Sequence, residues 1–172
     1  MTLSPRHRKV SLTAHVTSSV GWLGAVVCSL ALAIVGLASQ DAEVVRSVYR
    51  TMEVVGWYVL IPMSVASLLT GLVQSLGTRW GLFRHYWVVV KLIINVVASA
   101  VLLLYMQTLG YLADLAASTT SDLEALRSPS AVIHASGAVV LLVMATVLSV
   151  FKPPGLTRYG QRKTPALSPS PG

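Results

Sequence analysis

The chain has 172 residues, of which 54% are hydrophobic and only 11% are charged, and its formal net charge is +7. A soluble domain carries about a quarter charged residues, so a chain of this composition cannot cover itself with polar surface, and we exclude a water-soluble globular protein. The single cysteine, Cys28, excludes a disulfide framework within one chain. The sequence also lacks a nucleophile elbow, a P-loop, an HExxH motif and a glycine-rich dinucleotide turn.

The chain begins with a basic arm, residues 1–10, and an apolar run follows over residues 11–39. This run is about twice as long as the apolar core of a secretory signal peptide. It is long enough to cross a bilayer, which requires roughly 20 residues. We therefore expect a retained first transmembrane helix rather than a cleaved signal.

Three further apolar stretches, separated by polar loops, predict three more membrane helices. Their expected bounds are 48–76, 85–113 and 131–151. Pro62 removes a backbone hydrogen bond within the helix expected at 48–76, so we expect a kink there. The apolar stretch that begins at residue 85 exceeds the thickness of the hydrocarbon layer, so we expect its helix to project or to break near Gly110. With a basic tail at 152–172, the predicted fold is an all-α, four-helix transmembrane bundle.

The positive charges are distributed unevenly along the chain. The arm, the turn at 77–84 and the tail hold nine of the thirteen Lys and Arg residues and none of the six acidic residues. By the positive-inside rule, this asymmetry predicts a bacterial inner-membrane protein with both termini in the cytoplasm. The net charge then reflects topology and attraction to anionic lipid heads on the cytoplasmic side, and it does not indicate nucleic-acid binding.

Polar and small residues recur at helical spacing in each of the four helices, which predicts faces turned into the bundle. The predicted faces comprise His15, Ser18, Ser19, Trp22, Val26 and Ser29; then Glu53, Trp57, Ser64, Ser67, Gly71 and Gln74; then Lys91, Asn95 and Ser99; and finally His134, Ala138, Leu141, Ala145 and Ser149. For the serines and glycines, helix packing is a sufficient explanation, because small residues allow close approach and hydroxyls bond across the interface.

The ionisable residues within the helices form two predicted groups. His15 and Lys91 lie in the cytoplasmic half, and Glu53 and His134 lie at the outer boundary. We interpret Glu53 and His134 as a structural pair. Lys91 either extends back to the cytoplasmic surface or belongs to a site, because a charge inside a membrane helix requires a partner or water.

A neutral imidazole at His15 could ligate a haem iron or a copper ion, and Lys91 could serve as a second axial ligand or hold a propionate. The candidate cofactor site therefore comprises His15, Lys91, Trp22 and Asn95, with His15 as the candidate metal ligand. The candidate cofactors are haem b and a copper ion.

Two short motifs resemble known families. The pattern His15-x6-Trp22-x-Gly24 resembles the first helix of CopD-type copper-resistance membrane domains and of HemJ-type protoporphyrinogen oxidase. The segment Trp87-Val-Val-Val-Lys91-Leu resembles a later helix of both families. Over residues 11–163, the chain also looks like small bacterial four-helix membrane proteins of unassigned activity.

The resemblance to the oxidase implies a haem between His15 and Lys91, and the resemblance to the copper-resistance domains implies that His15 contacts a metal. The chain departs from the oxidase pattern, because no Arg-Leu pair follows Gly24 and no second histidine follows Lys91 in the third helix.

Three functions remain open from the sequence, and whether the protein is an enzyme remains open with them. The first is a haem- or metal-binding bundle of redox type. The second is a non-catalytic subunit or scaffold, either in a larger membrane complex or as a homo-oligomer. The third is a small transporter, for which Pro62 provides one broken helix but no matching second one is present.

Overall fold

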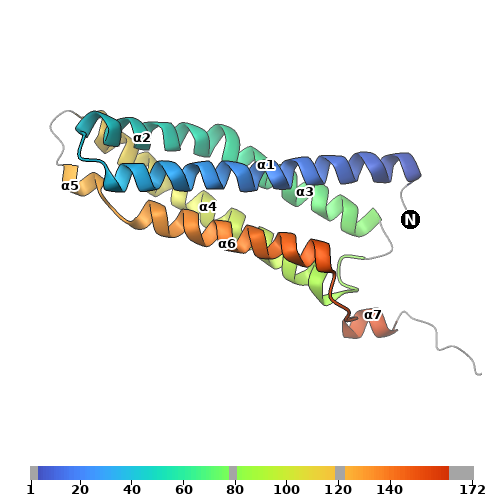
Figure 1. The fold of residues 1–172 in the computed structure, drawn as a ribbon. Helices are drawn as coiled ribbons and strands as arrows, with labels where there is room; N and C mark the ends of the chain where they lie inside the picture. Colours follow the sequence, from blue (N-terminus) through green and yellow to red (C-terminus); the bar gives the residue numbers. More distant parts are fainter. Residues whose placement is uncertain (1–3, 78–80, 119–122, 163–172) are drawn as a thin grey trace, which may run out of the picture.

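A computed structural model describes residues 4–77, 81–118 and 123–162 (Figure 1), and within these ranges it contains helices and no strand. The long helices are α1 (Pro5–Ala38), α4 (Tyr86–Ala117), α6 (Ser130–Phe151) and a third rod made of α2 (Ala42–Val55), the π-helical turn η1 (Gly56–Leu60) and α3 (Ile61–Gly77). The short helices are α5 (Leu123–Leu126) and α7 (Arg158–Arg162). Four rods are long and apolar enough to cross a membrane, which confirms the predicted all-α, four-helix architecture.

The four rods form a closed bundle. Helix α1 packs on α2, α3 and α6, and α4 packs on the same three helices from the opposite side. The start of α1, the α3–α4 turn and α7 lie at one end of the bundle, and the α1–α2 connection and α5 lie at the other (Figure 1). We call the first the basic end, because the described residues there include Arg6, Arg8, Lys9, Arg84, Lys152, Arg158 and Arg162. The opposite end is the acidic end, with Asp41, Glu43, Asp114 and Glu124.

Three helix bounds differ from the sequence-based expectation. The rod made of α2, η1 and α3 begins at Ala42 rather than at residue 48, because Asp41 caps α2 by accepting a hydrogen bond from the backbone N–H of Glu43. The first helix begins at Pro5 rather than at residue 11, because Ser4 caps it by accepting a hydrogen bond from the backbone N–H of His7, and proline is well suited to the first helical position. Part of the expected arm is therefore helical. The third predicted helix, α4, continues through Gly110 to Ala117 without the expected break.

The irregularity expected from Pro62 takes the form of the π-helical turn η1, which lies just before it. The N–H of Ile61 bonds to the carbonyl of Gly56, five residues back, so the turn accommodates one extra residue. Buried positions accordingly follow one another in steps of four, at Met52, Gly56, Leu60 and Ser64. This shift leaves Trp57 52% exposed, so the prediction that Trp57 faces the bundle interior is wrong.

The predicted inward face of α1 is confirmed, because Ser18, Trp22, Val26 and Ser29 are all buried. On α6, in contrast, the buried residues are Ala131 and Leu142, whereas the expected Leu141 is only half-buried and the expected His134 is exposed. The core divides into a cluster around Trp22 in the middle of the bundle and a larger one around the acidic-end part of α2 and α4.

Three arginines at the acidic end donate hydrogen bonds to backbone carbonyls at the C-terminal ends of membrane helices. Arg46 donates to the carbonyl of Ser118, and Arg50 donates to that of Ala116 at 2.9 Å, both at the end of α4. Arg127 donates at 3.0 Å to the carbonyl of Ser39, at the end of α1. The last carbonyls of a helix have no intrahelical partner and carry partial negative charge, so a guanidinium both satisfies and neutralises them.

We expect Gly36→Leu to lower the melting temperature by several degrees, because overpacking lowers the free energy of unfolding by about 1–3 kcal/mol. A Cβ atom at Gly36 would lie only 3.0 Å from Cγ1 of Val48 on α2. The matched control is Gly24→Leu in the same helix, where a Cβ would meet nothing within 4 Å. Thermal unfolding in detergent, followed by tryptophan fluorescence, measures both variants. Equal losses at the two positions would contradict the α1–α2 packing described above.

Candidate functional site

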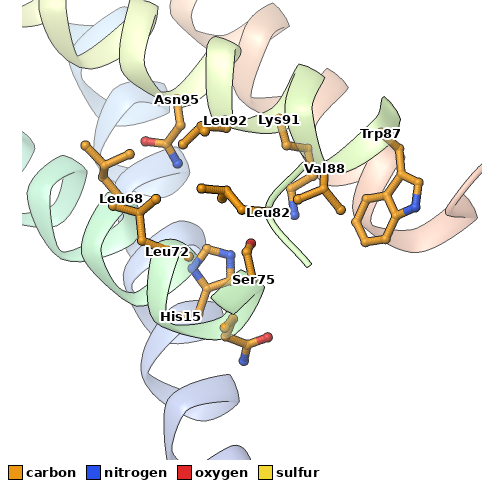
Figure 2. A pocket seen from close by; sticks show the side chains of 12 residues that line it. His15, Leu68, Leu72, Ser75, Leu82, Trp87, Val88, Lys91, Leu92 and Asn95 are labelled. Atoms are coloured by element: carbon orange, nitrogen blue, oxygen red, sulfur yellow. The ribbon is translucent and has the colours of Figure 1, made fainter. Parts of the chain in front are cut away.

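A cavity of about 100 Å³ lies between α1, α3 and α4 near the basic end. Figure 2 shows His15 and Lys91 on different sides of it, with Asn95 at its deeper part. The remaining wall is largely apolar and includes leucines of α3 and α4. The structure therefore brings together three of the four residues predicted for a cofactor site. Their shared position follows from helical spacing, since Trp87, Lys91 and Asn95 occur at intervals of four on one face of α4.

The amine of Lys91 is directed into the cavity rather than out toward lipid (Figure 2). Its nitrogen lies 5.8 Å from the centroid of the Trp87 ring, which is within the range of a cation–π contact. This contact is the only one recorded for the amine among the described residues, with no hydrogen bond or ion pair to any of them. The indole of Trp87 thus holds the lysine in place without neutralising its charge.

The ring of His15 is oriented by α3. Its Nδ1 lies 3.1 Å from the hydroxyl oxygen of Thr70. Because that hydroxyl donates its own hydrogen to the carbonyl of Ala66 at 2.6 Å, Nδ1–H is the donor to Thr70. The ring rests on Gly71, where a Cβ atom would lie 3.1 Å from Cε1 of His15. These contacts leave Nε2 as the ring atom that can serve a ligand.

A chain of hydrogen bonds joins the three helices beneath the cavity. The hydroxyls of Ser19 and Ser67 lie 2.9 Å apart, and Nδ2 of Asn95 donates to the hydroxyl of Ser67 at 3.3 Å. This bond fixes the amide of Asn95 and leaves its Oδ1 buried without a partner in the described part of the chain. Nε2 of Gln74, also in the wall of the cavity, is buried and has no such partner either.

The charges around the cavity have one sign. His15 and Lys152 both lie close enough to Lys91 to repel its ammonium group when they are protonated. On α4 itself the next acidic residue is Asp114, roughly 35 Å away at 1.5 Å per residue. Glu53 lies beside Gly110, which is also about 28 Å along the helix from Lys91. No described carboxylate therefore balances the amine.

The residues present do not fit a haem. A cavity of about 100 Å³ is well below the roughly 300 Å³ at which pockets for ligands of such size begin. Within the described residues, no group of three or more His, Cys, Asp or Glu side chains could hold a metal ion. A copper ion would find one imidazole nitrogen here, Nε2 of His15, and this is a poor donor set for copper.

Two other expectations about these residues differ from the structure. Trp22 does not line the cavity, because it is 2% exposed and packs deeper in the bundle with Leu60 and Leu142. Glu53 and His134 are not a pair. His134 bonds to the carbonyl of Ser130 at 2.8 Å and stacks on Tyr105, whereas Glu53 lies beside Gly110. Five residues at about 100° each place Tyr105 and Gly110 on different faces of α4.

The segment after α6, which the sequence pattern indicated only as a tail, packs against the α3–α4 turn and the start of α4. Lys152 adopts a left-handed conformation with φ of 43°, and the chain turns back onto the α3–α4 turn. The N–H of Thr157 donates to the carbonyl of Arg84 at 3.0 Å, and the N–H of Tyr86 donates to that of Gly155 at 3.4 Å. The two consecutive prolines followed by Gly155 were the available signal for such a turn.

Comparisons with protein-family models, with curated proteins and with solved structures found no significant match to this chain. The chemistry of the cavity itself must therefore carry the functional interpretation.

We expect Lys91→Met to raise the melting temperature in nonionic detergent without added phosphate, by the equivalent of about 1–3 kcal/mol. The substitution removes an amine that has no hydrogen-bond partner and keeps a side chain of similar shape. The matched control is Lys9→Met, which lies on the exposed start of α1 and should change stability by less than about 0.5 kcal/mol. A lower melting temperature for Lys91→Met would show that the amine has a stabilising partner.

Proposed function

We propose that this protein is a four-pass protein of the bacterial plasma membrane that binds a small anionic ligand in the cavity between α1, α3 and α4. The observation that carries the proposal is the amine of Lys91, which faces the cavity without a described carboxylate or hydrogen-bond acceptor. A cation in such a place is costly unless it is paired. A bound anion supplies the missing charge and accepts the hydrogen bonds.

The other polar groups of the cavity suit the same ligand. Nε2 of Gln74 offers a second donor, and Nε2 of His15 becomes a third when the ring is protonated. Charge-assisted hydrogen bonds to an oxyanion are about twice as strong as neutral ones, so the amine of Lys91 favours an anion over a neutral molecule. The unpaired Oδ1 of Asn95 in turn requires a donor, which a hydroxyl group on the ligand would provide.

Among the alternatives, the redox-type bundle loses support from the small cavity and the sparse donor set. The resemblance to the copper and haem families rests on two short motifs, and in the first of them His15 and Trp22 lie in different surroundings. A role as a subunit of a larger complex or as a homo-oligomer is compatible with anion binding. No observation favours the transporter, since η1 is the only irregular turn within the described membrane helices.

The orientation in the membrane is part of the proposal. The basic end carries both described ends of the chain, and the three arginines that lie at the other end are bound to helix carbonyls. With these three set aside, the positive-inside rule favours a cytoplasmic basic end.

Reporter fusions after Phe151 and after Ala117 test this orientation. We expect a cytoplasmic reporter, such as a fluorescent protein that folds only there, to be active at Phe151 and inactive at Ala117. A periplasmic phosphatase reporter should give the reverse result. Activity of the same reporter at both positions would contradict four crossings.

Binding of a free anion can be measured with inorganic phosphate. We expect added phosphate to raise the melting temperature, approaching about 2.7 kcal/mol of stabilisation at a hundred times the dissociation constant. Lys91→Met should abolish the stabilisation by phosphate, and Lys9→Met should keep it. Sodium chloride keeps the ionic strength constant in all of these measurements. A shift of equal size in all three proteins, or no shift in any, would contradict binding of a free anion.

A further inference from the structure

The neutral ring of His15 presents a hydrogen-bond acceptor to the cavity. A neutral imidazole carries one N–H and one nitrogen lone pair. The N–H is on Nδ1, because the hydroxyl of Thr70, 3.1 Å away, already donates its own hydrogen to the carbonyl of Ala66. The lone pair is therefore on Nε2. The neutral form also avoids a second positive charge beside the ammonium of Lys91.

The amine of Lys91 is the opposite kind of group, since it has three donors and no acceptor. It lines the same cavity as His15 but from another side (Figure 2). The two side chains are close enough to interact electrostatically. Because the cavity of about 100 Å³ holds only a compact group, a single ligand there meets both an ammonium and an imidazole lone pair.

The cavity has a second acceptor without a described donor. Oδ1 of Asn95, in its deeper part, is buried and unpaired within the described residues. Chloride and sulfate accept hydrogen bonds from an amine but have no hydrogen to give to such acceptors. A buried acceptor that stays unpaired is costly, so the walls of the cavity do not suit every anion equally.

We propose that the cavity selects an oxyanion that retains a hydrogen at neutral pH, such as hydrogen phosphate, over an oxyanion without one, such as sulfate. This inference rests on the proposed anion-binding function and specifies its ligand. The charged oxygens of the ligand accept hydrogen bonds from Lys91, and its hydroxyl donates to Nε2 of His15. A site that hydrogen-bonds a hydroxyl rejects an analogue that lacks it. Lys91 thus provides affinity for negative charge, and His15 provides specificity.

Phosphate and sulfate are a matched pair of probes for this inference. At slightly alkaline pH both are tetrahedral dianions, and they differ in the hydrogen that phosphate keeps. Thermal unfolding of the full-length protein in nonionic detergent, measured over a range of anion concentrations, gives a dissociation constant for each. Sodium chloride keeps the ionic strength constant. Both anions also stabilise proteins in general, so the shift that remains in Lys91→Met is subtracted.

We expect the dissociation constant of sulfate to be at least about tenfold higher than that of phosphate, equivalent to about 1.4 kcal/mol. His15→Leu removes the acceptor and should bring the ratio of the two constants close to one. His15→Gln should also lower the ratio, because its amide can turn to donate to sulfate or to accept from phosphate. This variant keeps the test decisive if His15→Leu does not fold. The matched control is His7→Leu, at the exposed start of α1, which should keep the full ratio.

Equal binding of phosphate and sulfate, both dependent on Lys91, would overturn the selectivity and leave the anion site standing. If neither anion gives a stabilisation that depends on Lys91, the anion site itself is wrong. A preference for phosphate that persists in both His15 variants would overturn the role of His15 as the acceptor.

Discussion

The arrangement of the basic end depends on a single constraint, which is that an amine placed near hydrocarbon must be held and must be balanced. The ring of Trp87 and the helix geometry hold Lys91, but no described side chain balances it. The same neighbourhood contains two amide atoms without partners, on Gln74 and Asn95. The hydroxyls of Ser19, Ser67 and Thr70 bond to one another or to backbone carbonyls. Buried polar atoms without a described partner also occur elsewhere in the bundle, for example on Trp22, Tyr49 and Ser99, and those of Gln74 and Asn95 differ in lining the same cavity as an unbalanced amine.

The positively charged side chains have different surroundings at the two ends of the bundle. At the acidic end, each arginine is bound to carbonyls that a helix terminus leaves open, so its charge is used within the protein. At the basic end, no described carboxylate lies beside the amine of Lys91, and in the same cavity Nε2 of Gln74 has no described acceptor and Oδ1 of Asn95 has no described donor. Positive charge that is satisfied locally explains stability, whereas positive charge that is left unbalanced indicates a ligand.

Periodicity in the sequence was enough to predict the four helices and to place His15, Lys91 and Asn95 together, because helical spacing is regular and lipid requires an apolar exterior. It failed where the spacing changes. The π-helical turn rotates the residues on its two sides relative to each other, so Trp57 turned outward although the pattern placed it inside. The expected pairing of Glu53 with His134 also failed, because equal depth in a bundle does not specify which faces meet. The packing of the segment around Thr157 on the α3–α4 turn depends on tertiary contacts that no local pattern contains.

The size of the cavity is what separates the ligand classes that the sequence left open. A histidine and a lysine on facing helices suit a haem as well as an anion when only residue types are considered. A haem, however, needs room on both sides of its iron, and a space of about 100 Å³ holds only a compact group. A phosphate is compact and is bound by a few hydrogen-bond donors and a positive charge, so the small cavity that argues against a haem is compatible with an anion of this size.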